Sequence, residues 1–451
     1  MDRIPLLGHR NPDQVVAYRD GRPVRRRRFL ADVARTAARL PAGGHLLNAC
    51  TDRYAFAVGL VASVVARTVS LLPANLAPET VRQLLQFRPD LICLTDGDDV
   101  PDVRCLRYVD AAPGDTDETM DGVPEVDGDQ PVAWLFTSGS TGEPVPHLRT
   151  WGSLWRNVGI EARRLALDSA GNQTIVATVP AQHSYGFESS LLVALRSGAA
   201  FSSARPFFPD DVRRALEAVP APRILVSTPF HLHLLAESDT RLPPVALLLS
   251  ATAPLAVELA QRLEAMTGAP LLEIYGSTDS GQIASRRTTT SLEWQLFDDV
   301  RLRPDAEGTW VEGGHVGAAV LLHDVLEVVG EDRFLLHGRT ADLVNIAGKR
   351  SSLGYLNHQL ACVPGVQDGV FVVPDEVSSG SGITRLAAVV VAPGLDPEAI
   401  RRSLRERIDP VFLPRPLVVV ATLPRNATGK LPRADLLAIV ADRAGPARDG
   451  R

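Results

Sequence analysis

The stretch LFTSGSTGEPVPHLRTW, residues 135–151, begins as an apolar strand and then turns through a run of small residues. Glycines permit close approach of the backbone, and hydroxyl groups and amides donate hydrogen bonds, so such a turn can cradle phosphate oxygens. It is not the G-x-x-x-x-G-K-[ST] phosphate loop, because no lysine follows Gly142 at the required place. Taken alone, a turn of this composition is more often an ordinary loop. Its candidate phosphate-binding residues are Thr137, Ser138, Gly139, Ser140, Thr141 and Gly142.

The alternation of secondary-structure patterns around this turn predicts an α/β fold. From about residue 29 to residue 240, helical stretches alternate with short apolar strands, which is typical of mostly parallel sheets. Residues 111–130 are polar and rich in turn formers, and they predict a surface loop. Beyond residue 300 the strands become shorter, and a βαβ-like tail follows. We expect a large N-terminal body of α/β subdomains over residues 1–341 and a small α+β domain over residues 342–451.

Composition excludes several classes of protein. The 451 residues are 45% hydrophobic, and 47 basic residues stand against 53 acidic ones, giving a net charge of −6. This balance provides no field that would draw the chain onto nucleic acid or an anionic membrane. No apolar run is long enough to cross a membrane, and the N-terminal residues do not resemble a signal peptide. We therefore expect no nucleic-acid partner, no membrane insertion and a cytoplasmic location.

Five further segments accompany the opening turn in a fixed order. They are VPAQHSYGFE (179–188), SATAPL (250–255), YGSTDSG (275–281), HGRTADLVNIAGKR (337–350) and PRNATGKLPR (424–433). Together with TSGSTGEP, the set resembles the adenylate-forming superfamily of acyl-CoA synthetases, aryl-acid ligases and peptide-synthetase adenylation domains. The resemblance covers nearly the whole chain. It implies the adenylate-forming enzyme fold, in which a small C-terminal domain moves against a large N-terminal body.

The resemblance also implies a reaction. ATP activates a carboxylate to an acyl-adenylate with release of pyrophosphate, and a thiol then captures the acyl group. Because two anions meet at the α-phosphate, such a step depends on positioning and on cations placed at the developing charge. The matching residues are Lys430 for that charge, Thr278 for a contact to the α-phosphate, and Asp279 for Mg²⁺. Asp279 stands where the family usually has glutamate.

The nucleotide's other contacts follow from the same motifs. Asp324 and Arg339 match the family's ribose-binding residues, although the usual Gly-Asp turn has become His323-Asp324. The expected adenine slot comprises Ala251, Thr252, Ala253, Tyr275 and Gly276. Tyr275 fits an ordinary core position about equally well.

The acid pocket is expected around the VPAQHSYGFE motif. His183 falls where the family has an aromatic residue or histidine at the substrate carboxylate, and it need not act as a base because the acid is already ionised. The candidate substrate-contacting residues are His183, Ser184, Tyr185, Phe230, Ser277 and Gly281. Their sizes favour a small aryl acid over a long alkyl chain.

Two further features concern the catalytic cycle. Asp342 matches the hinge about which the family's C-terminal domain rotates between adenylation and thioester formation. The loop after the hinge is Gly348-Lys349-Arg350. The family's phosphate loop continues with Pro-Lys-Gly, whereas this chain has Pro144-Val145-Pro146, so the loop lysine is missing.

The wording of the motifs is most similar to ligases of bacterial aryl-polyene and xanthomonadin-type pigment clusters, which load a hydroxybenzoate or related acid onto an acyl carrier protein. That resemblance favours an aryl-acid:carrier-protein ligase. An aryl- or acyl-CoA ligase that uses CoA remains the main alternative. Amino-acid activation and a non-catalytic module that senses a nucleotide remain open, and the presence of Lys430 argues against the second.

Overall fold

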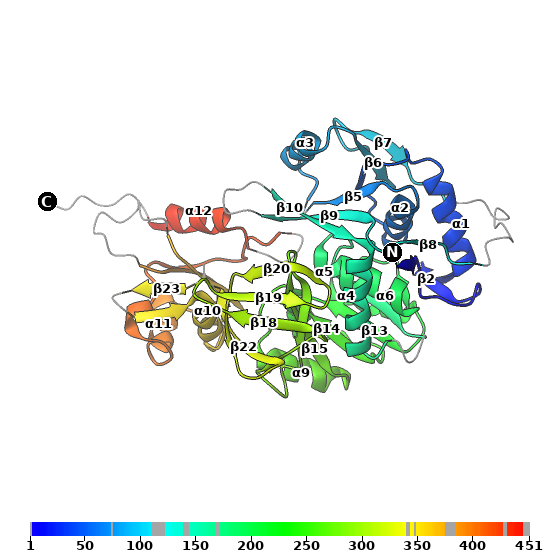
Figure 1. The fold of residues 1–451 in the computed structure, drawn as a ribbon. Helices are drawn as coiled ribbons and strands as arrows, with labels where there is room; N and C mark the ends of the chain where they lie inside the picture. Colours follow the sequence, from blue (N-terminus) through cyan, green and yellow to red (C-terminus); the bar gives the residue numbers. More distant parts are fainter. Residues whose placement is uncertain are drawn as a thin grey trace. The chain divides into compact units, whose positions relative to one another are not determined.

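Figure 1 shows the fold of the protein in a computed structural model. The structure describes residues 2–73, 75–110, 122–138, 144–167, 172–339, 343–346, 349–374, 385–426 and 431–444. The chain divides into two compact units. The first comprises Met1–Arg303, Val311–Val320 and Glu331–Arg333, and the second comprises Pro304–Trp310, Leu321–Gly330 and Phe334–Arg451. The boundary predicted near residue 342 falls outside the described residues and stays a prediction.

A six-stranded sheet forms one layer of the first unit. Its strands lie in the order β10 (Pro144–Thr150), β9 (Pro131–Ser138), β5 (Val69–Leu72), β4 (His45–Asn48), β6 (Leu91–Thr95) and β7 (Arg104–Arg107). Neighbouring strands are parallel except β9 and β10, which form an antiparallel pair at the edge. Helix α1 (Arg26–Ala37) precedes β4, and helices α2 (Arg53–Val65) and α3 (Pro78–Phe87) connect β4 to β5 and β5 to β6. Helix α2 is buried along nearly all its length, which explains why its sequence is apolar on every side.

The first unit also contains strands of a larger sheet. There its strands lie in the order β17 (Trp294–Leu296), β16 (Gly281–Arg286), β15 (Leu271–Ser277), β14 (Leu247–Ser250), β13 (Arg223–Ser227), β11 (Thr174–Ala177), β12 (Ala200–Ser202), β2 (Val15–Arg19) and β3 (Arg22–Arg25). The strands from β15 to β2 are parallel. Sequences such as LLLS and ILVS are buried throughout, as expected for parallel strands covered on both faces.

Helices cover this larger sheet, and most of them follow a parallel strand. They are α4 (Trp151–Arg164), α5 (Ser184–Gly186), the π-helical η1 (Phe187–Leu192), α6 (Val193–Ser197), α7 (Pro209–Glu217), α8 (Pro229–Glu237) and α9 (Val257–Thr267). Among the described residues, no helix combines the length and the apolar character needed to span a bilayer.

The strand order reverses at β11, and this reversal fixes where a ligand can bind. The chain passes from β11 to β12 on one side and then returns to β13 on the other side of β11. In open α/β sheets, ligands bind outside the carboxyl ends of the strands at such a switch point. The carboxyl ends of β11 and β13 are therefore the expected position of the site.

The polar stretch 111–130 is only partly the surface loop that we expect from its composition. Residues 111–121 lie outside the described residues, but β8 (Glu125–Asp127) pairs antiparallel with β1 (Arg3–Pro5). A strand three residues long gives almost no periodic signal, so pairing with β1 decides its conformation.

The second unit is smaller and of α+β type. Its elements are β21 (Asp324–Val328), β22 (Arg333–Arg339), β23 (Leu343–Ile346), β24 (Lys349–Ser352), α10 (Leu353–Ala361), β25 (Asp368–Val372), β26 (Ala387–Val391), α11 (Pro397–Arg405), the 3₁₀ turn η4 (Pro410–Phe412), β27 (Leu417–Val419) and α12 (Arg433–Ala444). Strand β26 lies between β25 and β27, and its residues are fully buried or nearly so. A separate three-stranded sheet comprises β18 (Val300–Pro304), β19 (Thr309–Gly313) and β20 (Val316–Leu322).

Candidate active site

The predicted motifs of the first unit follow the carboxyl ends of neighbouring parallel strands. His183, Ser184 and Tyr185 come after β11, and Phe230 comes after β13. The segment Ala251–Ala253 follows β14, and Gly276 to Asp279 end β15 and begin the turn after it. Because β11, β13, β14 and β15 are adjacent and parallel, these segments emerge along one edge of the sheet. That edge carries the switch point described above.

The hydroxyl-rich turn lies between β9 and β10. Strand β9 ends with Thr137 and Ser138, and Ser138 is opposite Pro144 at the start of β10. Gly139, Ser140, Thr141 and Gly142 lie outside the described residues. The two strands nevertheless fix both ends of the predicted phosphate-binding turn.

Strand β10 contacts the turn that follows β15. The Nε2 atom of His147 lies 3.2 Å from Oδ1 of Asp279, and both side chains are about one-quarter exposed, at 22% and 27%. The Nη2 atom of Arg149 donates to the carbonyl oxygens of Thr278 and Asp279 at 2.5 and 2.6 Å. The structure thus joins two segments that the sequence analysis treated separately.

Burial and neighbouring charges shift both basic groups. Burial lowers the pKa of His147, Asp279 acts in the opposite direction, and Arg149 lowers it further. Burial also lowers the pKa of Arg149, while the carboxylates of Glu188 and Asp279 oppose that change. Arg149 is therefore a half-buried group near two carboxylates, and it remains charged.

The turn from Ser277 to Gly281 is held at several points. The backbone N–H groups of Ser277 and Ser280 donate to each other's hydroxyl oxygens at 3.2 and 3.1 Å. His315 Nε2 lies 3.1 Å from the carbonyl oxygen of Ser280, and burial lowers the pKa of His315 to about 4. The ring is therefore neutral at pH 7, and Nε2 carries the proton because a carbonyl only accepts. These hydrogen bonds hold the turn in one conformation.

Gly281 closes this turn in a conformation that favours glycine. Its φ is +72°, and a Cβ atom there would lie 2.7 Å from Nδ2 of Asn157. Arg149, Asn157, Gly281 and His315 also line a cavity of about 10 Å³, roughly the space that one water molecule needs.

Asp279 fits the predicted metal ligand. Its Oδ1 atom is buried, and the described residues give it no hydrogen bond of normal geometry. The described residues contain no cluster of three or more His, Cys, Asp and Glu side chains that could hold a metal ion. Mg²⁺ in nucleotide sites is commonly held by one or two carboxylates together with substrate phosphates, so a single carboxylate is a suitable donor.

A buried polar cluster includes Glu188, the last residue of the acid-pocket motif. Glu161 in α4 accepts two hydrogen bonds from the Gln282 amide, at 2.7 and 3.2 Å, when that amide is oriented so that its oxygen accepts from Ser189. Asn157, one turn earlier in α4, donates to Glu188 Oε2 at 3.1 Å. Burial raises the pKa of Glu161 to about 8 and that of Glu188 to about 7.

The predicted acid-pocket residues His183, Ser184 and Tyr185 lie at the start of α5, and Phe230 lies beside another aromatic ring. The carbonyl oxygen of His183 accepts from Phe187 N at 2.7 Å, so His183 precedes the first turn of α5. The Tyr185 hydroxyl is buried, and burial raises its pKa well above the ordinary value. The ring of Phe230 lies 6.3 Å from that of Phe207.

The expected adenine slot combines a buried aromatic residue with a strained backbone. Tyr275 is 9% exposed, and its ring centroid lies 5.5 Å from that of Trp294. Thr252 is exposed and has a φ of +79°, a rare conformation for a β-branched residue. Strain of this kind costs about 1–3 kcal/mol and is concentrated at binding sites.

The two predicted ribose-binding residues are direct neighbours. Asp324 in β21 is the cross-strand partner of Arg339 in β22. Both belong to the second unit. The side chain of Arg339 lies outside what the structure describes, as do Asp342 and Lys430.

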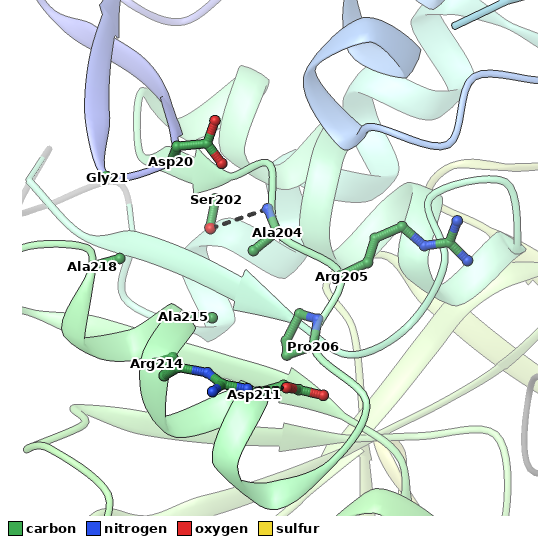
Figure 2. A pocket seen from close by; sticks show the side chains of 10 residues that line it. All are labelled: Asp20, Gly21, Ser202, Ala204, Arg205, Pro206, Asp211, Arg214, Ala215 and Ala218. Atoms are coloured by element: carbon green, nitrogen blue, oxygen red, sulfur yellow. Dashed lines mark hydrogen bonds and ion pairs between the residues drawn. The ribbon is translucent and has the colours of Figure 1, made fainter. Parts of the chain in front are cut away.

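A cavity of about 330 Å³ lies elsewhere in the first unit (Figure 2). Its lining residues are Asp20, Gly21, Ser202, Ala204, Arg205, Pro206, Asp211, Arg214, Ala215 and Ala218. Figure 2 shows Arg214 turned toward Asp211, with which it forms an ion pair at 2.6 Å. No predicted site residue lines this cavity, so it is separate from the candidate site.

Several residues of the site were missed by sequence reasoning. They are His147, Arg149, Asn157, Glu161 and His315, and Glu188 stands in the VPAQHSYGFE motif but received no role. His147 and Arg149 are two residues apart on a strand, which places them on one face. This spacing is the sequence feature that could have indicated that His147 and Arg149 act on the same neighbour.

Comparison with known proteins identifies the family. The family model described as AMP-binding enzyme matches residues 34–356, and the model described as AMP-binding enzyme C-terminal domain matches residues 357–430. A 4-coumarate–CoA ligase of Halorhodospira halophila is 32% identical over 311 residues, covering 65% of this chain and 73% of that protein. A salicylyl-CoA synthase / salicylate adenylyltransferase of a Streptomyces species is 25% identical over 392 residues, covering 78% of this chain and 70% of that protein.

Solved structures agree with the fold. The o-succinylbenzoate CoA synthetase of Bacillus subtilis in complex with its acyl-adenylate intermediate matches with a TM-score of 0.80 at 16% identity, covering 100% of both chains. The expected architecture of a large N-terminal and a small C-terminal domain is confirmed, and so is the expectation of an AMP-forming acid–thiol ligase. The chain belongs to the AMP-binding enzyme family.

Proposed function

We propose that this chain uses ATP and Mg²⁺ to convert a small aryl carboxylic acid, a hydroxybenzoate by preference, into its acyl-adenylate. The acyl group then passes to the phosphopantetheine thiol of an acyl carrier protein. The observation that carries the proposal is that the predicted acid and adenine segments follow the carboxyl ends of adjacent parallel strands, where β10, the strand after the predicted phosphate-binding turn, contacts Thr278 and Asp279.

Lysine usage supports the role of Lys430. Of the 47 basic residues only two are lysines, Lys349 and Lys430, and both lie in motifs of the family. A lysine ammonium is a compact charge that can approach both a carboxylate and an α-phosphate, whereas guanidinium is a planar fork. In a chain that otherwise uses arginine, Lys430 is thus the suited cation for the adenylation step.

The phosphate end of ATP would be held from two sides. The hydroxyls and amides of Thr137 to Gly142 would replace water around the leaving pyrophosphate, and Thr278 would contact the α-phosphate. Asp279 would hold Mg²⁺, which neutralises charge on the phosphates when it is bound. Its Oδ1 atom is buried and lies 3.2 Å from His147 Nε2 without a hydrogen bond of normal geometry among the described residues, which supports that role.

The remaining assignments concern the acid and the nucleoside. His183 would contact the substrate carboxylate, and Ser184, Tyr185, Phe230, Ser277 and Gly281 would complete the acid pocket. Tyr275, Gly276 and the Ala251–Ala253 segment would contact adenine. The cross-strand pair Asp324 and Arg339 would bind the ribose hydroxyls, because a carboxylate can accept from both hydroxyls at once.

The two half-reactions would use one site. We propose that residues 342–451 rotate about Asp342 after adenylation, which withdraws Lys430 and brings in the loop Gly348-Lys349-Arg350. The reaction consumes ATP and a phosphopantetheine thiol, so we place it in the cytoplasm.

The choice of acid and acceptor rests on the wording of the motifs and on the relatives. The Streptomyces relative is named for salicylate, a hydroxybenzoate, which supports a small aryl acid. The relatives named above are CoA enzymes, and this supports a second candidate, an aryl-CoA ligase.

The test is acid-dependent ATP–pyrophosphate exchange over hydroxybenzoates, cinnamates, medium-chain fatty acids and amino acids. Each active acid is then offered CoA or a phosphopantetheinylated carrier protein, and the thioester is detected by mass spectrometry. We expect exchange with a hydroxybenzoate and transfer to the carrier protein. Transfer to CoA alone would establish the second candidate, and exchange with fatty acids or amino acids alone would overturn the aryl-acid assignment.

A further inference from the structure

Strand β10 leaves the predicted phosphate-binding turn and carries two polar side chains that no family motif covers. His147 and Arg149 are two residues apart, so they project from the same face of the strand. Both reach the turn after β15, where His147 contacts the Asp279 carboxylate and Arg149 binds the carbonyls of Thr278 and Asp279. One strand therefore holds both the backbone and the side chain of the predicted metal-binding turn.

The local geometry of both strands supports this contact. The register of β10 against β9 shifts between Arg149 and Thr150, and the register of β15 against β16 shifts between Tyr275 and Gly276. Such irregularities bend a strand, re-aim its side chains, and occur often beside active sites. Each shift lies within three residues of the contact it serves.

The arrangement has a chemical context. The loop lysine of the family is replaced by Val145, and Asp279 replaces the longer glutamate. A shorter carboxylate reaches less far, so its direction matters more. The Arg149 guanidinium holds the backbone of the turn through the carbonyl oxygens of Thr278 and Asp279. The His147 imidazole limits rotation of the Asp279 carboxylate through its contact with Oδ1.

We propose that His147 and Arg149 are positioning residues for the phosphate end of ATP, with Arg149 fixing the Thr278–Asp279 backbone and His147 aiming the Asp279 carboxylate at Mg²⁺. The inference rests on the proposed function, because it takes Asp279 as the metal ligand. Neither residue touches the reacting atoms in this account. Partners of metal-binding side chains typically contribute about 10–100-fold to metal affinity.

The test compares His147→Leu with His147→Gln. Glutamine keeps an N–H donor near the position of Nε2, whereas leucine keeps only the volume. We expect His147→Leu to raise the Mg²⁺ concentration for half-maximal ATP–pyrophosphate exchange about 10–100-fold. The KM for the acid should stay unchanged, and His147→Gln should recover most of the loss.

A binding measurement separates this inference from the proposed function. Isothermal titration of the full chain with magnesium pyrophosphate, in the absence of any acid, should show the same loss for His147→Leu and the same recovery for His147→Gln. If the wild type showed no exchange with any acid but this binding pattern held, the proposed function would fail while the positioning role stood. Unchanged binding and unchanged Mg²⁺ dependence in His147→Leu would overturn the inference.

Matched controls exclude a general effect of losing such contacts. His45 on β4 forms a comparable pair with Asp90 at 2.9 Å, so His45→Leu removes a histidine–aspartate contact whose two residues lie outside the motifs. Arg223 at the start of β13 donates to the carbonyls of Leu216 and Val219 at 2.7 and 2.9 Å. Arg149→Leu should weaken magnesium pyrophosphate binding, whereas Arg223→Leu should lower thermal stability without that change. Equal effects of the two arginine variants on binding would contradict a positioning role for Arg149.

Discussion

The Nε2 atom of His147 lies 3.2 Å from Oδ1 of Asp279, and this contact links the strand after the phosphate-binding turn to the turn that ends β15. Both residues belong to the first unit. The contacts that orient the predicted phosphate site therefore form within one compact part of the chain. The residues that we propose for the ribose, Asp324 and Arg339, and the proposed adenylating lysine, Lys430, belong to the second unit.

Replacement of Lys430 tests the assignment of the adenylating cation. Lys430→Ala should lower ATP–pyrophosphate exchange about 10²–10³-fold, the usual cost of removing one group that stabilises transition-state charge. Lys349→Ala should retain exchange and slow thioester formation, because its loop serves the second half-reaction. Circular dichroism and thermal unfolding check that both variants fold. Full exchange in Lys430→Ala would refute the assignment.

Gly281 allows backbone strain and steric clash to be separated. Its φ of +72° resembles the +67° of Gly268, but a Cβ at Gly268 would meet nothing within 4 Å, whereas one at Gly281 would lie 2.7 Å from Asn157. Gly268→Ala should therefore cost about 1 kcal/mol of stability. Gly281→Ala should cost more and should also reduce exchange, since it displaces the turn that carries Asp279. Denaturant unfolding of both variants measures the difference, and equal costs would show that the predicted clash is relieved.

Glu161 predicts a pH dependence of stability. Its pKa is raised from 4.5 to about 8 by burial, so the folded state holds the proton that the unfolded state releases above pH 4.5. The free energy of unfolding should fall as pH rises from about 5 to about 8, by up to about 1.4 kcal/mol per pH unit from this group. Glu161→Gln cannot ionise, so its stability should fall less over that range. Urea unfolding at pH 5, 7 and 9 measures the effect, with Glu237→Gln as the control because Glu237 forms an exposed ion pair. Parallel curves for wild type and Glu161→Gln would show that Glu161 keeps an ordinary pKa.

Asp324 should govern nucleotide affinity. Asp324→Asn removes a charge that can accept from both ribose hydroxyls, so the KM for ATP should rise about tenfold, as expected for loss of one charged hydrogen bond. The KM for the acid should not change. Glu327→Gln, on the same strand, alters an exposed carboxylate paired with His337 and serves as the control. An unchanged KM for ATP in Asp324→Asn would remove the ribose assignment.

Sequence reasoning succeeded where chemistry is local to one motif. Alternating helices and apolar strands predicted the α/β body, and the motifs predicted which segments form the site, whereas the strand order of the structure shows which of them lie at one carboxyl edge. Asp324 and Arg339 came from separate motifs, yet they are cross-strand partners. The order and direction of the strands determine which motif residues become neighbours.

The missed residues depend on tertiary packing. Glu161 and Gln282 lie in α4 and β16, far apart in the chain, and neither belongs to a polar cluster in the sequence. Arg149 contacts the Thr278 carbonyl beside a register shift in β10, and no periodic pattern in the sequence encodes either feature. Strand β8 within the polar stretch 111–130 likewise exists through its pairing with β1.

The most direct test of the central claim follows the oxygen atoms of the acid. The chain is incubated with ATP, Mg²⁺, the thiol acceptor and a hydroxybenzoate labelled with ¹⁸O in its carboxylate, and the released AMP is analysed by mass spectrometry. Attack of the carboxylate on the α-phosphate, followed by transfer of the acyl group to the thiol, leaves one ¹⁸O atom on AMP. Our account predicts AMP carrying one ¹⁸O atom. Unlabelled AMP, or ADP as the nucleotide product, would contradict it.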